Sequence, residues 1–192
     1  SQALQMVSRS DAGMVRSHNE DAVFINAPMG LAILADGMGG YNAGEVASGM
    51  ATTLLGTELE KAFQKTAPHQ QEASGKLHSH VVLEAEIARA NTAIYQAAQS
   101  QPQYAGMGTT LVTAVFYDNM MTVAHIGDSR LYRLRGGEFQ AITRDHSLLQ
   151  EQIDSGMITA EEARHSQNKN LVTRALGVDP VVEPEIRDYD TM

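Results

Sequence analysis

Two places in the sequence combine an acidic residue with glycine at the end of an apolar run. Asp36 and Gly37 open the segment DGMGG directly after the run LAILA, and Asp128 lies within residues 125–130 (HIGDSR). A carboxylate at a strand end, next to a glycine with an uncovered carbonyl, can hold a hard cation such as Mg²⁺ or Mn²⁺. The alternative at both places is a tight turn, in which the aspartate accepts hydrogen bonds from nearby backbone N–H groups.

Two further segments carry charged groups. In residues 11–21 (DAGMVRSHNED), Arg16 precedes Glu20 by four residues and Asp21 by five. A guanidinium group can form two parallel hydrogen bonds with a phosphate, and the alternative for Arg16 is a surface ion pair with Glu20. The fourth segment, residues 143–147 (TRDHS), could simply provide the N-cap of the helix that follows it.

The composition limits the chemistry that these groups could perform. The chain has 192 residues and no cysteine, which excludes a disulfide framework, a thiolate metal site and a cysteinyl-phosphate intermediate. Its 23 acidic and 14 basic side chains give a net charge of −9, which disfavours binding to nucleic acid or to an anionic membrane. An acidic protein that acts on phosphate needs local positive charge, and metal ions held by carboxylates are one source of it.

The length and the apolar pattern predict a soluble protein with one domain. No apolar stretch approaches the roughly 18 residues that a membrane helix needs, and the first residues lack the apolar core of a signal peptide. We therefore expect a cytoplasmic protein with a single core over residues 1–192.

The elements that must position the charged groups follow from the periodicity of the sequence. Apolar alternation and β-branched residues predict strands at 3–7, 22–26, 31–35, 109–117, 120–126, 131–135 and 181–187. Apolar residues spaced near 3.6 predict long helices at 43–64 and 77–99, and shorter helical pieces from 147 and at 160–163. Strands, two helices, strands, a helical insert and a last strand are typical of an α+β fold rather than an alternating βαβ series.

Six motifs occur in the order RSHNED, ADGMGG, GMGTT, GDSR, TRDHS and TRALG, and they span nearly the whole chain. In this order and spacing the sequence resembles the bacterial branch of the protein phosphatase 2C family of metal-dependent serine/threonine phosphatases. The resemblance implies a sandwich of two antiparallel β-sheets flanked by helix pairs. It also implies a mobile helical flap at about residues 147–170 that helps to select substrates.

The resemblance assigns metal-binding roles to individual residues. Asp36 matches the carboxylate that bridges two metal ions, and Gly37 contributes its backbone carbonyl to one of them. Glu20 matches a residue that contacts the second ion through water, and Asp21 supports the same motif. Asp128 matches a ligand of a third, weaker metal site.

The implied activity is hydrolysis of phosphoserine or phosphothreonine in proteins by water that two Mn²⁺ or Mg²⁺ ions activate. An all-oxygen ligand set suits these ions better than zinc. With water as the attacking group no side-chain nucleophile is required, which agrees with the absence of cysteine. Arg16 matches the guanidinium that binds the substrate phosphate. The expected partner is a phosphoprotein substrate of a bacterial serine/threonine kinase.

The sequence departs from the family pattern in two respects. Met38 occupies the position of a histidine that many members use to protonate the leaving oxygen, while His18, His125 and His146 lie within other motifs. The family's later Asp-Gly and Asp-Asn motifs, which supply further metal carboxylates, do not occur before Met192. We therefore expect a phosphatase domain that is incomplete at its C-terminus, or a sheet that another polypeptide completes.

Two function classes stay open at this point. The set of intact site residues favours an enzyme, whereas the two absent motifs favour a catalytically impaired module that binds a phosphoprotein or a regulatory partner. A nucleotide-binding protein that uses the glycines of DGMGG is disfavoured, because no lysine and threonine follow them at P-loop spacing.

Overall fold

The structure, a computed structural model that describes residues 3–192, is built on one antiparallel sheet. Five strands pair in the order β1-β2-β4-β5-β8, and the short strand β3 extends the pairing of β2. These strands are β1 (Asp21–Asn26), β2 (Leu31–Met38), β3 (Gly108–Thr109), β4 (Leu111–Tyr117), β5 (Met120–Ile126) and β8 (Glu185–Asp190). A separate hairpin consists of β6 (Tyr132–Arg135) and β7 (Glu138–Ala141).

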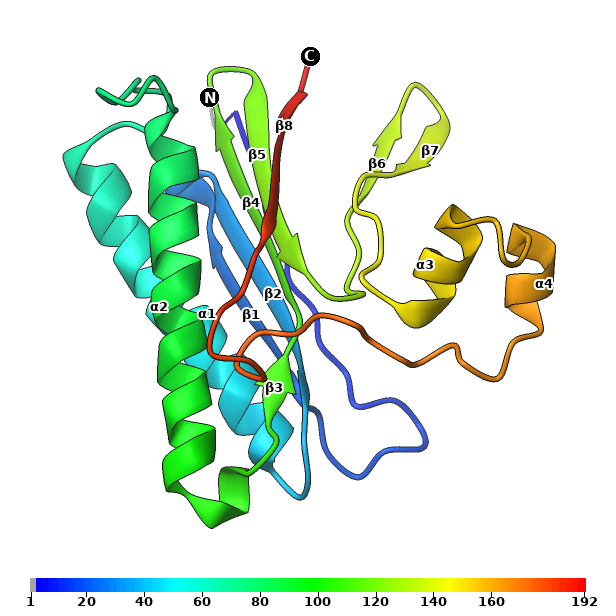
Figure 1. The fold of residues 1–192 in the computed structure, drawn as a ribbon. Coiled ribbons are helices and arrows are strands. Elements are labelled where there is room, and N and C mark those ends of the chain that lie inside the picture. Colours follow the sequence, from blue (N-terminus) through cyan, green and yellow to red (C-terminus); the bar gives the residue numbers. More distant parts are fainter. Residues whose placement is uncertain (1–2) are drawn as a thin grey trace.

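Two long helices cover one face of this sheet (Figure 1). α1 (Ala43–Lys65) and α2 (His78–Ser100) pack against each other, and α1 lies directly on β1 and β2. Their apolar stripes and the sheet share one core. Its largest fully buried side chains are Leu31, Ile33, Leu55, Leu59, Leu83, Ile87, Ile94, Met107, Leu111, Val115, Ile126 and Leu176. Because burial of one such side chain contributes about 2 kcal/mol, this layer fixes the two helices on the sheet.

Two short 3₁₀ turns connect these elements. The turn η1 (Ala27–Met29) joins β1 to β2; the Asn26 side chain accepts a hydrogen bond from the Met29 N–H group (3.2 Å), and Gly30 ends the turn at φ 71°. The turn η2 (Pro102–Tyr104) follows α2 and leads toward β3. Each turn has a proline in its first positions, where no backbone N–H group is needed.

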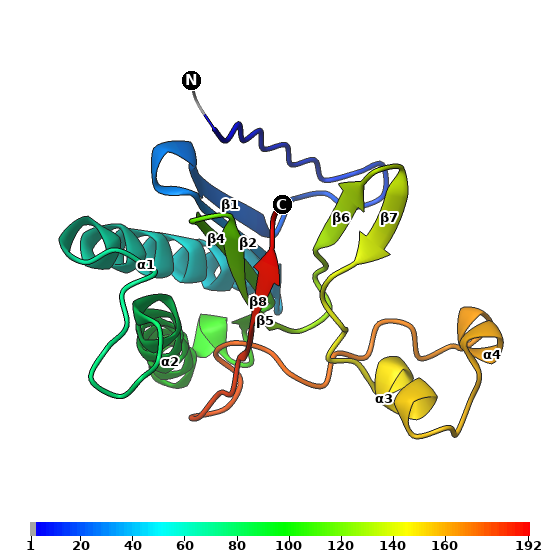
Figure 2. The same cartoon turned by 90° about the horizontal axis from the view of Figure 1, so that it is seen from above.

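The β6–β7 hairpin and two short helices lie on the other side of the sheet from α1 and α2 (Figure 2). The helices α3 (Leu148–Asp154) and α4 (Ala160–Arg164) form an insert, whose base is closed by a β-bridge between Ser147 and Val172. The Ser147 hydroxyl accepts a hydrogen bond from the Gln150 N–H group (3.2 Å). The segment 143–147 therefore does provide a helix N-cap, through its last residue.

The α+β class with antiparallel sheets is confirmed. The helices predicted at 43–64 and 77–99 match α1 and α2 within one residue at each end. Within residues 3–192 the second sheet of the expected sandwich is the β6–β7 hairpin. No helix within residues 3–192 combines the length and the apolarity that a membrane crossing requires.

One predicted strand does not form, one strand was missed, and one begins later than predicted. Residues 3–7 form no strand, because none of the described residues pairs with them. Strand β7 was not predicted, since its residues (EFQA) are exposed throughout and show no apolar alternation. The last strand begins at Glu185 rather than Val181, because Pro184 has no N–H group and the pairing with β5 starts at His125 and Glu185.

Candidate metal centre

Acidic side chains from two neighbouring strands meet at one end of the main sheet. The register of β1 and β2 places Asp21 directly opposite Asp36. Because Leu31, Ile33 and Ala35 of β2 are buried under the helices, Asp36 faces the opposite side of the sheet. Like charges in directly opposed positions destabilise a sheet, so this pair requires a compensating partner.

The pKa of Asp36 reflects this crowding of negative charge. Although its side chain reaches solvent, burial by the atoms around it raises the pKa to about 6. The charge of Asp21, a hydrogen bond with Asp21 and the charge of Asp128 raise the pKa further, while Arg16 lowers it. The pKa of Asp128 is raised as well, first by burial and then by the charge of Asp145. A cation among these groups would favour their ionised forms.

Glu20 is held between β1 and the start of α1. Its backbone carbonyl accepts hydrogen bonds from the Gly37 N–H group (3.0 Å) and the Ser48 hydroxyl (2.6 Å). A methyl group added to Gly44, in the first turn of α1, would lie 2.6 Å from Glu20 Oε1, and one added to Gly37 would overlap the Gly44 carbonyl oxygen. The two glycines therefore let the strand and the helix meet, with the Glu20 carboxylate beside the positive end of α1.

The Arg16 guanidinium lies at the rim of the site. Its Nη1 is 3.9 Å from Glu20 Oε2, and 76% of the Arg16 side chain stays exposed. A hollow of about 420 Å³ adjoins it, lined by Val15, Arg16, Ser17, His18, Glu20, Gly39 and Tyr41. The ion pair with Glu20 is therefore present but long, and the guanidinium remains accessible to an anion from solvent.

The residues predicted for the site all lie at this end of the sheet, because the strand registers align the ends of β1, β2 and β5 there. They are Arg16, Glu20, Asp21, Asp36, Gly37 and Asp128. One expectation about them is wrong: Asp36 is neither in a turn nor the last residue of its strand. β2 continues through Met38, because Gly37 and Met38 pair with β3. The turn follows at Gly39, where φ is 154°.

A cluster of two buried histidines and Glu185 lies beside β8. The His125 and His146 rings stack 4.6 Å apart, and their Nε2 atoms are 3.4 and 3.7 Å from Glu185 Oε2. His125 Nε2 donates to the Arg144 carbonyl (2.9 Å), and His146 Nδ1 accepts from the Gly127 N–H group (3.1 Å). His125 therefore gives its Nε2 proton to the Arg144 carbonyl, and His146 carries its proton on Nε2. With both Nε2 atoms protonated, neither ring has a free lone pair for a metal ion beside Glu185. Burial, first of all, lowers the pKa of His146 to about 4, so the ring is neutral at neutral pH.

Sequence reasoning gave no role to several residues that support the site. Arg130 binds the Asp145 carboxylate through Nε and Nη2, at distances of 2.7 to 3.2 Å. Thr110 hydrogen-bonds both Asp36 and Ser129. Thr110 lies in the motif GMGTT, and Ser129 and Arg130 lie in the motif GDSR, so these motifs were the only signal in the sequence for their role. Their contacts span 15 to 74 residues of sequence, which no local pattern reveals.

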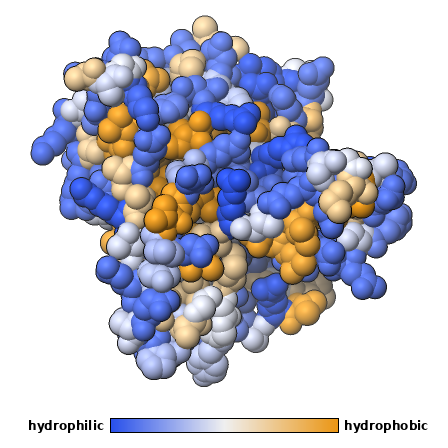
Figure 3. Space-filling view, in the orientation of Figure 1, coloured by the Kyte–Doolittle hydropathy of each residue, from blue (hydrophilic) through white to orange (hydrophobic). Residues whose placement is uncertain are grey.

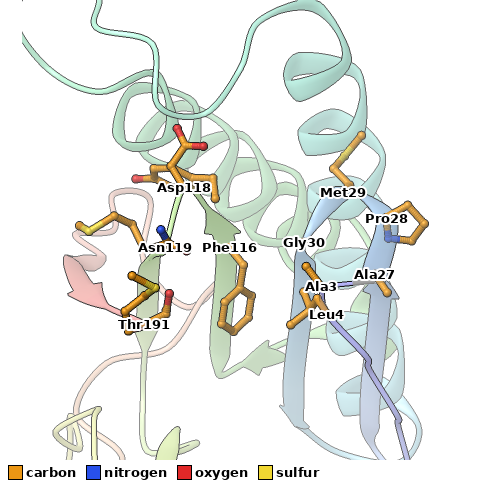
Figure 4. A pocket seen from close by; sticks show the side chains of 13 residues that line it. Ala3, Leu4, Ala27, Pro28, Met29, Gly30, Phe116, Asp118, Asn119 and Thr191 are labelled. Atoms are coloured by element: carbon orange, nitrogen blue, oxygen red, sulfur yellow. The ribbon is translucent and has the colours of Figure 1, made fainter. Parts of the chain in front are cut away.

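A larger hollow lies at the opposite end of the sheet, between the turns that join β1 to β2 and β4 to β5 (Figure 4). It has a volume of about 850 Å³ and is lined mainly by apolar side chains and backbone. Asp118 is the one acidic residue in its lining, and its Oδ2 lies 3.0 Å from His69 Nδ1. Its lining offers no group of carboxylates that could hold a cation.

Comparison with known proteins agrees with the chemistry of the carboxylate end. The sequence profile of the family described as Protein phosphatase 2C matches residues 14–174. The serine/threonine protein phosphatase PstP of Mycobacterium tuberculosis is 41% identical over 173 residues, which is 90% of this chain. A crystal structure of PstP/Ppp from that organism has a TM-score of 0.82 at 38% identity, over 96% of this chain and 72% of that chain. This chain belongs to the protein phosphatase 2C family.

Two further comparisons bear on metal content and on length. The crystal structure of the PstP catalytic domain in complex with two manganese ions has a TM-score of 0.77 at 39% identity, over 96% of this chain and 71% of that chain. The chain spans 31% of the length of PstP and 68% of the length of the phosphatase stp of Listeria welshimeri, which is 39% identical over 178 residues. All six predicted site residues lie within the part that the family profile matches.

Proposed function

We propose that this chain is a metal-dependent protein serine/threonine phosphatase, which hydrolyses phosphoserine and phosphothreonine in proteins. The observation that carries the proposal is the opposition of Asp21 and Asp36 across two strands, with Asp128 close enough to raise the pKa of Asp36. Crowded carboxylates beside the exposed guanidinium of Arg16 suit a phosphate group that is bound through cations and an arginine. Membership of the protein phosphatase 2C family supports the same class of reaction.

The donor groups fit divalent cations such as Mn²⁺ or Mg²⁺. Asp36, Glu20 and the Gly37 carbonyl would hold two ions with the support of Asp21, and Asp128 would contribute to a third, weaker site. The set contains only oxygen donors, which these hard ions prefer. The two manganese ions described for PstP support a pair of ions in this chain as well. When bound, such ions activate water for attack on phosphorus and stabilise the negative charge of the transferred phosphoryl group.

The chain's own residues bind the phosphate and manage the proton of the leaving group. Arg16 binds two phosphate oxygens and orients the phosphoryl group, a task for which its planar fork is better suited than lysine. Met38 follows Gly37 and has no proton to donate to the leaving oxygen. His18 lies beside the site, with Nε2 3.8 Å from Glu20 Oε1, and is therefore our candidate for holding that proton.

The substrate that we infer is a phosphoprotein made by a bacterial serine/threonine kinase in the cytoplasm. The relatives that support this are bacterial proteins named as serine/threonine phosphatases. Residues 147–170, which include α3 and α4, would act as the flap that selects substrates. They project from the body of the molecule, and hydrophobic side chains reach the surface beside them (Figure 3). Such a surface offers contacts to residues that flank the phosphorylated one.

Hydrolysis of p-nitrophenyl phosphate and of a phosphothreonine peptide, in Mn²⁺ or in chelator, tests the proposal. Asp36→Asn removes the charge of the central carboxylate. It should lower Mn²⁺-dependent activity by at least about 100-fold, because metal-ion catalysis contributes several kcal/mol. Asp118→Asn is the matched control at the other end of the sheet. Asp118 has φ 45°, a conformation that asparagine tolerates. It should leave activity unchanged.

Assaying both this chain and the full product of its reading frame gives each outcome a clear meaning. Activity in either, lost with chelator and in Asp36→Asn but kept in Asp118→Asn, supports the phosphatase. No hydrolysis at either length, together with equal phosphopeptide binding by the parent and by Asp36→Asn, would instead indicate a phosphate-binding module.

A further inference from the structure

One buried threonine lies opposite Asp36 at a gap between two strands. The pairing of β2 with β4 and with β3 follows one register, which places Thr110 across from Asp36, although Thr110 belongs to neither strand. The Asp36 N–H group donates to Thr110 Oγ1 (3.0 Å), and the Thr110 N–H group donates to the Asp36 carbonyl (2.9 Å). The threonine hydroxyl thus accepts the hydrogen bond that a backbone carbonyl accepts elsewhere in the ladder.

The Thr110 side chain also contacts both neighbours of Asp128. Its Oγ1 lies 2.6 Å from Ser129 Oγ. Because Oγ1 accepts the Asp36 N–H group, its own proton is available for Ser129. A methyl group added to Gly127 would lie 2.9 Å from Thr110 Cγ2, so the threonine methyl packs directly against this glycine. The hydroxyl of Thr110 therefore holds one flank of Asp128 and its methyl group holds the other.

Burial leaves little room for a substitute. Thr110 is only 1% exposed, and Gly127 adopts φ 100°, a conformation that glycine accepts readily. If the hydroxyl is removed, the Asp36 N–H group loses its acceptor on the side where the buried Thr110 lies. The backbone at Asp36 and the loop at Asp128 would then be free to shift relative to each other.

We propose that Thr110 is a positioning residue, whose hydroxyl fixes the separation of the Asp36 and Asp128 carboxylates for divalent cations. The role rests on the metal-dependent function proposed above. It requires no contact between Thr110 and the substrate. Supporting residues that orient the ligands of a metal typically change its affinity by about 10- to 100-fold when they are mutated.

Thr110→Val tests the role of the hydroxyl, because it keeps the branched shape and the methyl group. We expect calorimetry to show Mn²⁺ binding at least about 10-fold weaker than in the parent. The Mn²⁺ concentration for half-maximal activity should rise by a similar factor, while kcat at saturating Mn²⁺ changes little. Thr110→Ser keeps the hydroxyl. Its Mn²⁺ affinity should stay within about threefold of the parent, a smaller change than the loss expected for Thr110→Val.

Thr113, which lies in β4 three residues after Thr110, offers a matched control. It is also buried, but its Oγ1 has no hydrogen-bond partner among the described residues. Thr113→Val makes the same chemical change and should leave Mn²⁺ affinity unchanged. Ser129→Ala removes only the link to the Asp128 loop and should weaken Mn²⁺ binding less than Thr110→Val does. It also keeps the test open if Thr110→Val fails to fold by circular dichroism.

Different results would contradict the positioning role of Thr110 and the proposed phosphatase function. If the parent protein neither binds Mn²⁺ nor hydrolyses phosphate esters, the proposed function is wrong. If the parent does both and Thr110→Val, folded, binds Mn²⁺ as Thr113→Val does, Thr110 is not a positioning residue. Unchanged Mn²⁺ affinity in Ser129→Ala would likewise overturn the link between the two carboxylates.

Discussion

The two ends of the main sheet differ in what their connections bring close together. At one end Asp21 and Asp36 face each other, and the Gly37–Gly44 contact leaves no space for a side chain. At the other end the turns enclose a hollow of about 850 Å³, whose acidic residue Asp118 is paired with His69. The larger cavity is thus at the end that lacks the candidate metal ligands. Crowding of like charge identifies the candidate site here, whereas cavity volume does not.

Gly44→Ala should give the largest effect, because it acts on the carboxylate end. The new methyl group would lie 2.6 Å from Glu20 Oε1 and 2.9 Å from the Gly37 carbonyl carbon, so Glu20 and the strand must move. A displacement of about 1 Å at such a site can lower kcat/KM by about 100-fold. Gly49→Ala, in the same helix with open space around it, should keep full activity and gain up to about 1 kcal/mol of stability. Equal kcat/KM in the two variants would contradict the close fit.

Gly30→Ala makes the same substitution at the opposite end of the sheet. It should lower the stability of the fold without changing activity. Gly30 has φ 71°, and an added methyl group would overlap the Phe116 carbonyl oxygen. We expect a loss of about 1 to 3 kcal/mol in the free energy of unfolding, measured in urea. The kcat/KM per folded molecule and the Mn²⁺ affinity should stay unchanged. A loss of Mn²⁺ affinity would show that the two ends are coupled.

The raised pKa of Asp36 predicts an unusual pH dependence of stability in chelator. The folded-state pKa of about 6 lies above the ordinary 3.8, so the folded protein binds this proton more tightly than the unfolded chain does. The stabilising contribution is complete below pH 3.8 and is lost as the pH rises through about 6. Asp36→Asn should remove this loss, so that its advantage over the parent grows between pH 4 and pH 7. Asp118→Asn should follow the parent, as thermal melts across this range would show.

His69→Gln should have the smallest effect, because the Asp118 pair is exposed at the far end. The two side chains lie 3.0 Å apart and both remain largely in solvent. Surface pairs of this kind contribute about 0.2 to 1 kcal/mol. Thermal melting should therefore shift little and Mn²⁺-dependent hydrolysis not at all. A clear loss of hydrolysis would contradict the assignment of chemistry to the other end.

The parts of the fold that could be predicted from the sequence are those with a regular apolar period. α1 and α2 each bury one stripe, so their period was visible and their ends were predicted within one residue. The order of the motifs led, through the family resemblance, to the prediction that Asp36 and Asp128 serve neighbouring metal sites, and the two carboxylates do lie close enough for the charge of Asp128 to raise the pKa of Asp36. The exposed strand β7 has no such pattern, and its place depends on the hairpin pairing with β6.

The details of the site depend on contacts that sequence spacing does not encode. That β2 continues past Asp36 follows from its pairing with β3, about 70 residues away in the chain. The hydrogen bonds of Thr110 join it to residues 74 and 19 positions away. The fit of Gly44 against Glu20 likewise appears only when the helix lies on the strand. Such features require the tertiary arrangement, because no period or composition distinguishes these residues from their neighbours.

The insert of α3 and α4 is fastened at its base, independently of what lies within it. Ser147 and Val172 form a bridge, and the Thr173 N–H group donates to the His146 carbonyl (3.0 Å). Lengthening a loop that is already closed at its base costs little, since the entropy of closure grows only slowly with length. A change of length or sequence within the insert should therefore leave the carboxylates on the sheet undisturbed.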